Sequence, residues 1–339
     1  MKVIGITGTN GKTTTTHIVC EVLQKAGFPA AKIGTITNRL TTPSPWELAE
    51  IFAQESRKGT EYLVMEVSSH GIHQDRVRGI FFHVKAMTNI TRDHLDYHKT
   101  FRAYQKVKYG WLRRGAGIKI YPGDWCQEKI DFVHPYHGKF NEDNVRTALA
   151  VLKSLNILPE KKLKKLFATL SPVPGRFEVI HKNPYVIVDY AHTPDGLENL
   201  LRAVLDLRRD QKSVGRILTV FGCGGDRDKG KRPTMGRLAL RQSDICLVTS
   251  DNPRTENPGQ IIENILAGMK KNILTRHKQI MVEPDRRAAI RQAVRLARAA
   301  DFVVLAGKGH ETYQVFGSRR QHFDDREEAR KALQQCRPK

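Results

Sequence analysis

Cysteine is scarce in this chain of 339 residues and follows no pattern. The five cysteines are odd in number, far apart and without the CxxC spacing that marks zinc-binding or redox-active pairs. They are Cys20, Cys126, Cys223, Cys246 and Cys336. We therefore expect reduced thiols and no disulfide framework.

Long hydrophobic runs are also missing. No apolar segment approaches the roughly 18 to 20 residues that a bilayer-spanning helix needs, and residues 1–10 carry no signal-peptide pattern. The 15 prolines and 26 glycines are too few for a fibrous chain, and 40% hydrophobic residues exclude a disordered one. These absences predict a globular, cytoplasmic protein without a membrane partner.

Acidic residues are in short supply, because 35 Asp and Glu face 57 Lys and Arg and leave a net charge of +22. This excess permits a nucleic-acid partner, but it suits equally an enzyme that handles nucleotides and carboxylated substrates. Four arginines recur at helical spacing in residues 287–298, yet no aromatic residues interleave with them, and a solvated helix face explains them better. A nucleic-acid-binding P-loop protein stays a remote alternative, and we expect no nucleic-acid partner.

Short β-branched runs alternate with segments of helical periodicity, as in parallel βαβ units. The strand-like runs of the first half cover residues 3–7, 32–36, 62–67 and 84–90, and helices are expected at 141–155 and 159–170. Those of the second half cover residues 185–190, 217–222, 244–250, 279–283 and 301–307. The pattern blurs at 110–137, and a boundary falls near 172–175. The sequence therefore predicts two α/β domains in tandem, 1–174 and 175–339.

The first predicted strand leads into the glycine-rich segment 8–13 and then into a helical stretch. A strand, a glycine loop and a helix N-terminus together form a cradle of backbone N–H groups for phosphates. Lys12 would neutralise the β and γ phosphates, and Thr13 would offer its hydroxyl to magnesium. The usual GxxxxGK[ST] spacing needs glycine where Ile6 stands, so this is a P-loop variant, and a plain glycine turn is the alternative.

Candidate metal ligands follow two later strands, where ligands of parallel sheets bind. Glu66 comes at the end of the run 62–67, and residues 88–98 pack two Asp and two His into eleven positions. Such oxygen and imidazole donors suit magnesium or substrate handling. Taken alone, a polar loop with helix-capping aspartates explains the second segment equally well.

Eight segments in a fixed order make the chain resemble the Mur ligase family. They are GTNGKTTT (8–15), EVSSHG (66–71), TNITRDHLDYH (88–98), PGRFE (174–178), DYAHTPD (189–195), GGDRDKGKR (224–232), DNPR (251–254) and GKGHE (307–311). The resemblance implies a P-loop-type parallel-sheet ATPase domain, here shortened, followed by a Rossmann-like α/β domain that binds an amino acid. It is greatest to the members that add meso-diaminopimelate to the D-Glu carboxylate of UDP-MurNAc-L-Ala-D-Glu in peptidoglycan precursor synthesis. They use ATP and Mg²⁺, and the amine attacks an acyl phosphate.

The resemblance also implies roles for residues. The residues implied to bind ATP are Gly8, Thr9, Asn10, Gly11, Lys12, Thr13, Thr14, Asn141, Asn144, Arg176, Asp189 and His192. The implied catalytic set is Lys12, Glu66, His94 and Lys108, and the metal ligands are Thr13, Glu66, His94 and Lys108. Lys108 would serve as an N6-carbamate, and Lys106 is the neighbouring lysine without this role.

Two further groups of residues are implied for the other substrates. The acceptor would contact Thr41, Thr42, Ser68, Gln74 and Arg76, although a surface salt bridge is an alternative for Arg76. The amino acid would contact Arg227, Asp251, Asn252, Pro253, Arg254, Gly307 and Glu311. An arginine can pair bidentately with a distal carboxylate, which lysine as a substrate lacks, and Glu311 suits an ammonium group.

The sequence departs from the family at two places. It opens at the P-loop strand, where family members have an N-terminal domain that grips uridine diphosphate, and the segment 108–140 is shorter than usual. We expect intact chemistry in a monomer and three alternatives for the acceptor. The nucleotide-sugar peptide binds through the remaining contacts, a non-uridylylated muropeptide or other γ-glutamyl carboxylate replaces it, or a separate chain supplies UDP recognition.

Overall fold

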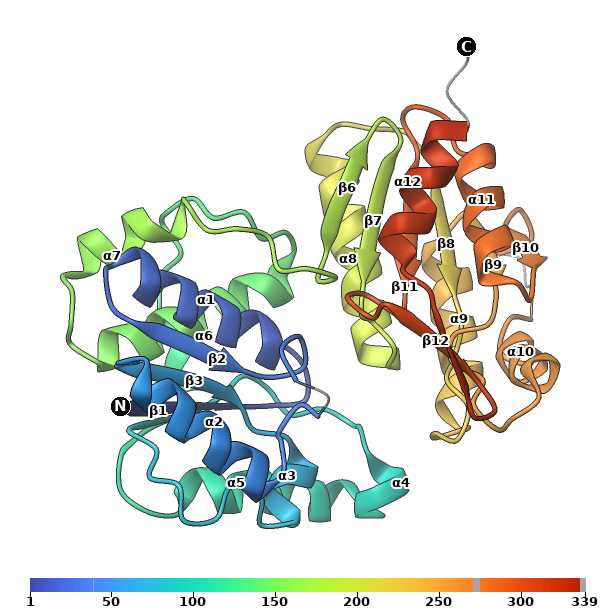
Figure 1. Ribbon diagram of the computed structural model, residues 1–339. Coiled ribbons are helices and arrows are strands. Elements are labelled where there is room, and N and C mark those ends of the chain that lie inside the picture. The colour runs from blue at the N-terminus through green and yellow to red at the C-terminus, as the bar shows by residue number, and fades with distance from the viewer. Residues whose placement is uncertain (39, 271–274, 336–339) are drawn as a thin grey trace. The chain divides into compact units, whose positions relative to one another are not determined.

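The computed structural model describes residues 1–38, 40–270 and 275–335. It divides into two compact units, which we call the N-terminal unit, Met1–Pro172, and the C-terminal unit, Val173–Lys339 (Figure 1). No helix in these described ranges combines the length and the hydrophobicity that a bilayer crossing requires. Each unit has its own sheet and its own core.

The N-terminal unit is built on a five-stranded sheet of order β2-β3-β1-β4-β5. The strands are β1 (Lys2–Thr7), β2 (Ala30–Ile33), β3 (Tyr62–Glu66), β4 (Val84–Met87) and β5 (Ile118–Ile120). Every pairing between neighbours is parallel. The carboxyl ends of the strands therefore gather at one edge, where ligands of such sheets bind.

Helices cover both faces of this sheet (Figure 1). They are α1 (Lys12–Lys25), α2 (Pro45–Arg57), α3 (Ser69–His73), α4 (Leu95–His98), α5 (Phe101–Arg113), α6 (Lys139–Ser154), α7 (Glu160–Phe167) and the 3₁₀ helix η1 (Asp124–Gln127). On one face Leu48 of α2 and Trp111 of α5 join Leu63 of β3 in a buried cluster. Full burial of one such side chain contributes roughly 1.5 to 3 kcal/mol, so this packing fixes where α5 lies.

The C-terminal unit has a six-stranded sheet of order β10-β9-β8-β11-β7-β6 and a separate hairpin, β12-β13. The strands are β6 (Glu178–Lys182), β7 (Tyr185–Asp189), β8 (Ile217–Phe221), β9 (Ile245–Val248), β10 (Gln279–Val282), β11 (Phe302–Ala306), β12 (Tyr313–Phe316) and β13 (Arg319–His322). The helices are α8 (Pro194–Asp210), α9 (Lys231–Gln242), α10 (Pro258–Leu266), α11 (Arg286–Leu296) and α12 (Asp325–Gln335). Only β6 runs antiparallel to its neighbour among the described strands of this sheet.

The strand-like runs of the sequence all correspond to strands, but the runs 32–36 and 84–90 each extend three residues beyond the strand, which ends at Ile33 and Met87 respectively. Strand β2 ends at Ile33 because Gly34 begins a turn. The Gly34 carbonyl accepts hydrogen bonds from the backbone N–H groups of Thr37 and Asn38. The second predicted helix also ends early, at Phe167 instead of 170. Strands β5, β6, β12 and β13 were not predicted.

Candidate active site

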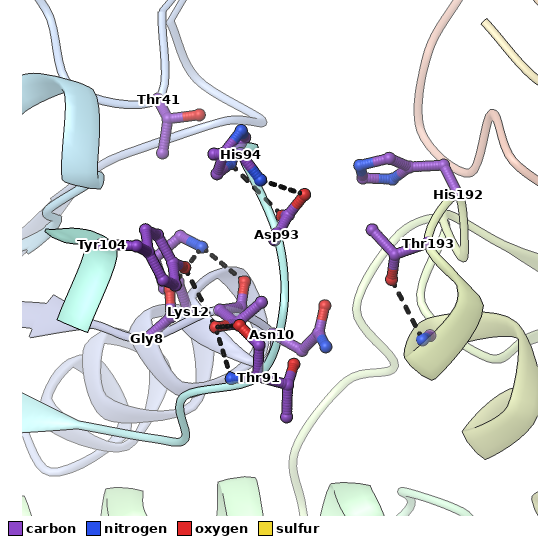
Figure 2. Close-up of polar contacts among 12 residues, drawn as sticks. Gly8, Asn10, Lys12, Thr41, Thr91, Asp93, His94, Tyr104, His192 and Thr193 are labelled. Atoms are coloured by element: carbon purple, nitrogen blue, oxygen red, sulfur yellow. Dashed lines mark hydrogen bonds and ion pairs between the residues drawn. The ribbon is translucent and has the colours of Figure 1, made fainter. Parts of the chain in front are cut away.

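The glycine loop lies between the end of β1 at Thr7 and the start of α1 at Lys12. Gly11 has a φ of 84°, and a Cβ atom there would lie 2.0 Å from Oδ1 of Asn144. Lys12 Nζ donates hydrogen bonds to the carbonyls of Gly8 (2.9 Å) and Thr9 (2.8 Å), so its charge lies over the loop (Figure 2). Thr14 is buried in the first turn of α1. The loop therefore presents a cation and a helix N-terminus together, as a phosphate site requires.

The segment 88–91, after β4, holds this loop in place. Asn10 donates its N–H to Asn89 Oδ1 (2.9 Å), and its carbonyl accepts a bond from Asn89 Nδ2 (3.1 Å). The Thr91 N–H donates to Thr9 Oγ1 (2.9 Å), which also bonds the Tyr104 hydroxyl (3.0 Å; Figure 2). We assigned no role to Asn89 or Thr91 from the sequence, although their position after a buried strand was a usable signal.

Glu66 ends β3, and its side chain is only 2% exposed. Its carboxylate accepts hydrogen bonds from the Thr13 hydroxyl (2.9 Å) and from the Thr35 N–H (2.8 Å) and hydroxyl (3.0 Å). All three donors are neutral, so none of them balances the charge of a buried carboxylate. Gly34 is required beside it, since a Cβ there would lie 2.1 Å from Glu66 Oε1.

Lys108 approaches the same loop from α5. It is 1% exposed, and its Nζ donates to the Gly8 carbonyl (2.7 Å) and the Thr7 hydroxyl (3.1 Å). Burial, reinforced by the charge of Lys12 and opposed by Asp93, holds the pKa of Lys108 well below its ordinary value. Lys106, two residues earlier, is exposed on the other side of the helix.

His94 lies in the loop before α4, with a left-handed φ of 54°. Its backbone N–H bonds to Asp93 Oδ1 (2.8 Å), and its ring pairs with Oδ2 (3.3 Å; Figure 2). Burial lowers the pKa of His94 to about 4; Asp93 opposes this shift, and Lys12 adds to it. The imidazole is therefore neutral near pH 7 and can offer a lone pair to a metal.

The four predicted metal ligands belong to the N-terminal unit. Thr13 and Glu66 are in direct contact, Lys108 reaches the adjoining Gly8 carbonyl, and His94 lies beside Asp93. Within the described residues, no group of three or more His, Cys, Asp and Glu side chains is arranged to hold a metal. A metal bound here would therefore also need the Thr13 hydroxyl and the oxygens of a carbamate on Lys108.

The residues predicted for the acceptor form one network, which comprises Thr41, Thr42, Ser68, Gln74 and Arg76. Thr42 Oγ1 bonds the Glu66 carbonyl (3.0 Å) and the Ser68 hydroxyl (3.1 Å), and it accepts the Ser68 N–H (2.9 Å). Arg76 donates to the Thr42 carbonyl (2.8 Å) and to the Gln74 side chain. These contacts differ from the surface salt bridge that was the alternative for Arg76. Thr41 bonds the Thr35 hydroxyl (3.1 Å), so the network adjoins Glu66.

The predicted ATP contacts beyond the loop fall into both units. In the N-terminal unit, Asn144 Nδ2 bonds Asn141 Oδ1 (3.1 Å), and Asn144 also lies against Gly11. In the C-terminal unit, Arg176 stacks 4.3 Å above the Tyr190 ring, and His192 Nδ1 lies 2.8 Å from the Tyr190 carbonyl.

Asp189, also in the C-terminal unit, accepts the N–H groups of Phe177 and Ala191, each at 2.7 Å. Burial raises the pKa of Asp189, against the influence of Arg176. The carboxylate therefore fixes the turn that leads from β7 toward α8 and His192.

The residues predicted for the amino acid surround Lys308, which the sequence reasoning missed. Lys308 Nζ lies 3.6 Å from Asp251 Oδ1, 3.3 Å from Asn252 Oδ1 and 3.2 Å from Glu311 Oε2. Asn252 Nδ2 donates to Glu311 Oε2 (2.9 Å), and the backbone of Gly307 has a φ of 119°. Only its place inside GKGHE pointed to Lys308.

The other residues predicted for the amino acid lie around the loop 224–227. Arg254 has a φ of 52° and donates from Nη1 to the Gly225 carbonyl (2.7 Å). Pro253 closes a turn by accepting the Glu256 N–H (3.1 Å). A Cβ on Gly224 would lie 2.8 Å from Arg254 Nη1 and 3.8 Å from Arg227 Cγ, so both arginines border this glycine.

Comparison with known proteins identifies the family. The model described as "Mur ligase middle domain" matches residues 6–128, and "Mur ligase, glutamate ligase domain" matches residues 175–309. The chain therefore belongs to the Mur ligase family. It is an ATP-dependent acid–amino-acid ligase of that family.

Individual relatives show which members of the family the chain is similar to. The UDP-N-acetylmuramoyl-L-alanyl-D-glutamate–2,6-diaminopimelate ligase of Thermosynechococcus vestitus is 41% identical over 99% of this chain and 77% of its own length. A solved structure of a ligase with the same name is 31% identical, with a TM-score of 0.61 over 99% of this chain and 78% of that one. The Yersinia pestis folylpolyglutamate synthase/dihydrofolate synthase, solved with AMPPNP and a Mn ion, shares the fold at 19% identity and a TM-score of 0.67, over 91% of this chain and 86% of that one.

Proposed function

We propose that this ligase adds meso-diaminopimelate to the D-Glu carboxylate of UDP-MurNAc-L-Ala-D-Glu. One observation carries the proposal: the contacts run without a break from Lys12 and Thr13, through Glu66, to Thr42 and the acceptor network. A phosphate cradle next to an acceptor site is what transfer of a γ-phosphate to a carboxylate needs. We assign residues 1–174 to ATP and acceptor binding and 175–339 to amino-acid binding, in a cytoplasmic monomer.

In this reaction Lys12 and the N–H groups of residues 8–14 neutralise and orient the phosphates. The γ-phosphate passes from ATP to the acceptor carboxylate with release of ADP, the amine attacks the acyl phosphate, and an amide forms with release of phosphate. Asn141 and Asn144 would hold the adenine beside the loop. Arg176, Asp189 and His192 would add the ATP contacts of the C-terminal unit.

The donors fit divalent cations, and we assign one Mg²⁺ to Thr13 with the ATP phosphates and a second Mg²⁺ to Glu66, His94 and carbamylated Lys108. The buried Glu66 carboxylate, whose donors from Thr13 and Thr35 are neutral, and the neutral His94 imidazole support this assignment. When bound, the second ion would supply charge neutralisation for the two anionic substrates. A carbamate on Lys108 would replace a buried cation by an anionic oxygen ligand beside Gly8.

For the acceptor, the network of Thr41, Thr42, Ser68, Gln74 and Arg76 supplies hydroxyls and a guanidinium. These groups suit a peptide carboxylate and do not by themselves require a uridine diphosphate. A non-uridylylated muropeptide is therefore the second candidate. The two acceptors are distinguished by offering each in turn to the same enzyme, with and without a separate UDP-binding chain.

The experiment traps the acyl phosphate with hydroxylamine in place of the amino acid. Protein, ATP, Mg²⁺ and UDP-MurNAc-L-Ala-D-Glu should yield a hydroxamate of the acceptor, detected by mass. Lys12→Ala should abolish it, whereas Lys25→Ala, at the far end of the same helix, should leave it unchanged. A Lys12→Ala enzyme that still forms the hydroxamate would refute the P-loop assignment.

A further inference from the structure

Lys308 is wholly buried beside the residues predicted to bind the amino acid. Its ammonium group lies between two carboxylates, 3.6 Å from Asp251 and 3.2 Å from Glu311. It also lies 5.6 Å from the centre of the Tyr313 ring. Burying an ammonium group is costly, so such a position is stable only where partners compensate the charge.

The charges of this pocket balance. Asp251 and Glu311 contribute two negative charges, and Lys308 and Arg254 contribute two positive ones. Arg286 and Asp325, which are both fully buried nearby, neutralise each other in a bidentate pair of 2.7 and 2.8 Å. Arg227 is exposed, so solvent screens it. A neutral pocket suits a ligand end that carries one ammonium and one carboxylate.

One carboxylate oxygen of this cluster is buried without a hydrogen-bond donor from the described part of the chain. Asp251 is 7% exposed, and its Oδ1 has no hydrogen-bond partner among the described residues. Burial opposes ionisation of Asp251, but Lys308, Arg286, His192 and Arg254 outweigh it and lower the pKa of this carboxyl. For Glu311, burial raises the pKa, and Lys308 counteracts that effect. Lys308 thus favours the ionised form of both.

We propose that Lys308 determines which amine the enzyme uses, by setting the net charge of the pocket that holds the far end of the amino acid. With Lys308 the pocket is neutral and accepts the zwitterionic end of a diamino dicarboxylate. Without it the pocket carries one excess negative charge and favours an amine whose far end is a cation only, such as L-lysine. Lys308 acts through Asp251 and Glu311, so it is a positioning residue. The inference rests on the proposed function.

The test compares meso-diaminopimelate with L-lysine in the wild type and in three variants. Lys308→Gln removes the charge and keeps hydrogen-bond donors, and Lys308→Arg keeps the charge. Lys308→Gln combined with Glu311→Gln restores neutrality without the lysine. We expect the ratio of kcat/KM for diaminopimelate to that for lysine to fall roughly tenfold or more in Lys308→Gln, since tenfold corresponds to only about 1.4 kcal/mol. It should return toward the wild-type ratio in the other two variants.

Hydroxamate formation with hydroxylamine reports separately on the ATP and acceptor halves of the enzyme. A variant that keeps it is folded and forms the acyl phosphate. Equal losses for both amines in Lys308→Gln, or a double variant that stays as unselective as the single one, would overturn the charge-balance role. A wild type that forms neither hydroxamate nor any amide would instead refute the proposed function.

Discussion

Three lysines of this chain differ mainly in what surrounds their ammonium groups. Lys12 lies over the glycine loop on two backbone carbonyls, Lys108 is buried against Gly8, and Lys308 is buried between two carboxylates. The sequence predicted roles for the first two through their motifs. It missed the third because burial and carboxylate contacts depend on β11 and the loop after β9 meeting in space.

Lys108 and Lys106 give a matched pair of substitutions on one helix. We expect Lys108→Ala to lower kcat by about a hundredfold or more, the range seen when one group that stabilises the transition state is lost. Lys106→Ala should change it less than about twofold, because that side chain faces solvent. Steady-state phosphate release measures both. Lys108→Arg cannot form a carbamate, so an active Lys108→Arg enzyme would contradict the carbamate assignment.

Gly11 and Gly27 both have positive φ angles, but only one of them is confined. A Cβ at Gly11 would lie 2.0 Å from Asn144, whereas one at Gly27 meets nothing within 4 Å. Gly27→Ala should cost only the backbone term of roughly 1 to 2 kcal/mol. Gly11→Ala should cost more and weaken ATP binding as well. Thermal melts with and without ATP separate the two effects, and equal shifts would argue against the close approach of Asn144.

At the scale of elements, strongly patterned segments could be predicted and the others could not. The runs that became β1, β3, β4, β8 and β11 are rich in hydrophobic residues, and they are buried on both faces of parallel sheets. β6 and β13 are edge or hairpin strands with mixed polarity, so their sequence carries little periodicity. β2 ends where Gly34 begins a turn, and the close approach of Gly34 to Glu66 is a contact that no local pattern contains.

The candidate site was predictable to a similar degree. Its loops were found because strands end in polar motifs, but the contacts among them, such as Thr35 on Glu66, join segments about thirty residues apart, and a single sequence does not reveal such pairs. The residue roles themselves remain predictions.

The loop 224–227 is tied to α9 through Glu256. Arg232 of α9 donates to Glu256 at 2.8 and 2.9 Å, and the Asp226 N–H donates at 2.6 Å. The bond to Arg232 lowers the pKa of Glu256 to about 2, below its ordinary 4.5. The resulting stabilisation is therefore fully present above pH 4.5 and is lost as the pH falls toward 2.

We accordingly expect Glu256→Gln to lower the melting temperature at pH 7, and the difference from the wild type to shrink from about pH 4.5 downward. Glu142→Gln, which removes an exposed pairing with Arg146, should have little effect at either pH. Melting curves between pH 7 and pH 3.5 measure both variants. A difference that stays constant over this range would contradict the ion pair.

At the scale of the whole molecule, the proposed reaction assigns a separate half of the chemistry to each unit. The N-terminal unit contains the glycine loop, Glu66 and the residues proposed for the acceptor, and the C-terminal unit contains the charged cluster around Lys308 that is proposed for the amino acid. The excess of 22 positive charges fits the proposed substrates, ATP and a carboxylated peptide, which are anions. The chain spans about three quarters of the length of its relatives, 77% for the ligase of Thermosynechococcus vestitus.

The most direct measurement incubates the full chain with ATP, Mg²⁺ and UDP-MurNAc-L-Ala-D-Glu, with meso-diaminopimelate or L-lysine in parallel reactions. Phosphate release and product mass are followed together. The account predicts one amide product with diaminopimelate, formed in step with phosphate, and far less with lysine. No product with either amine, from protein that binds ATP, would contradict the proposed acceptor, and equal use of both amines would contradict the proposed pocket.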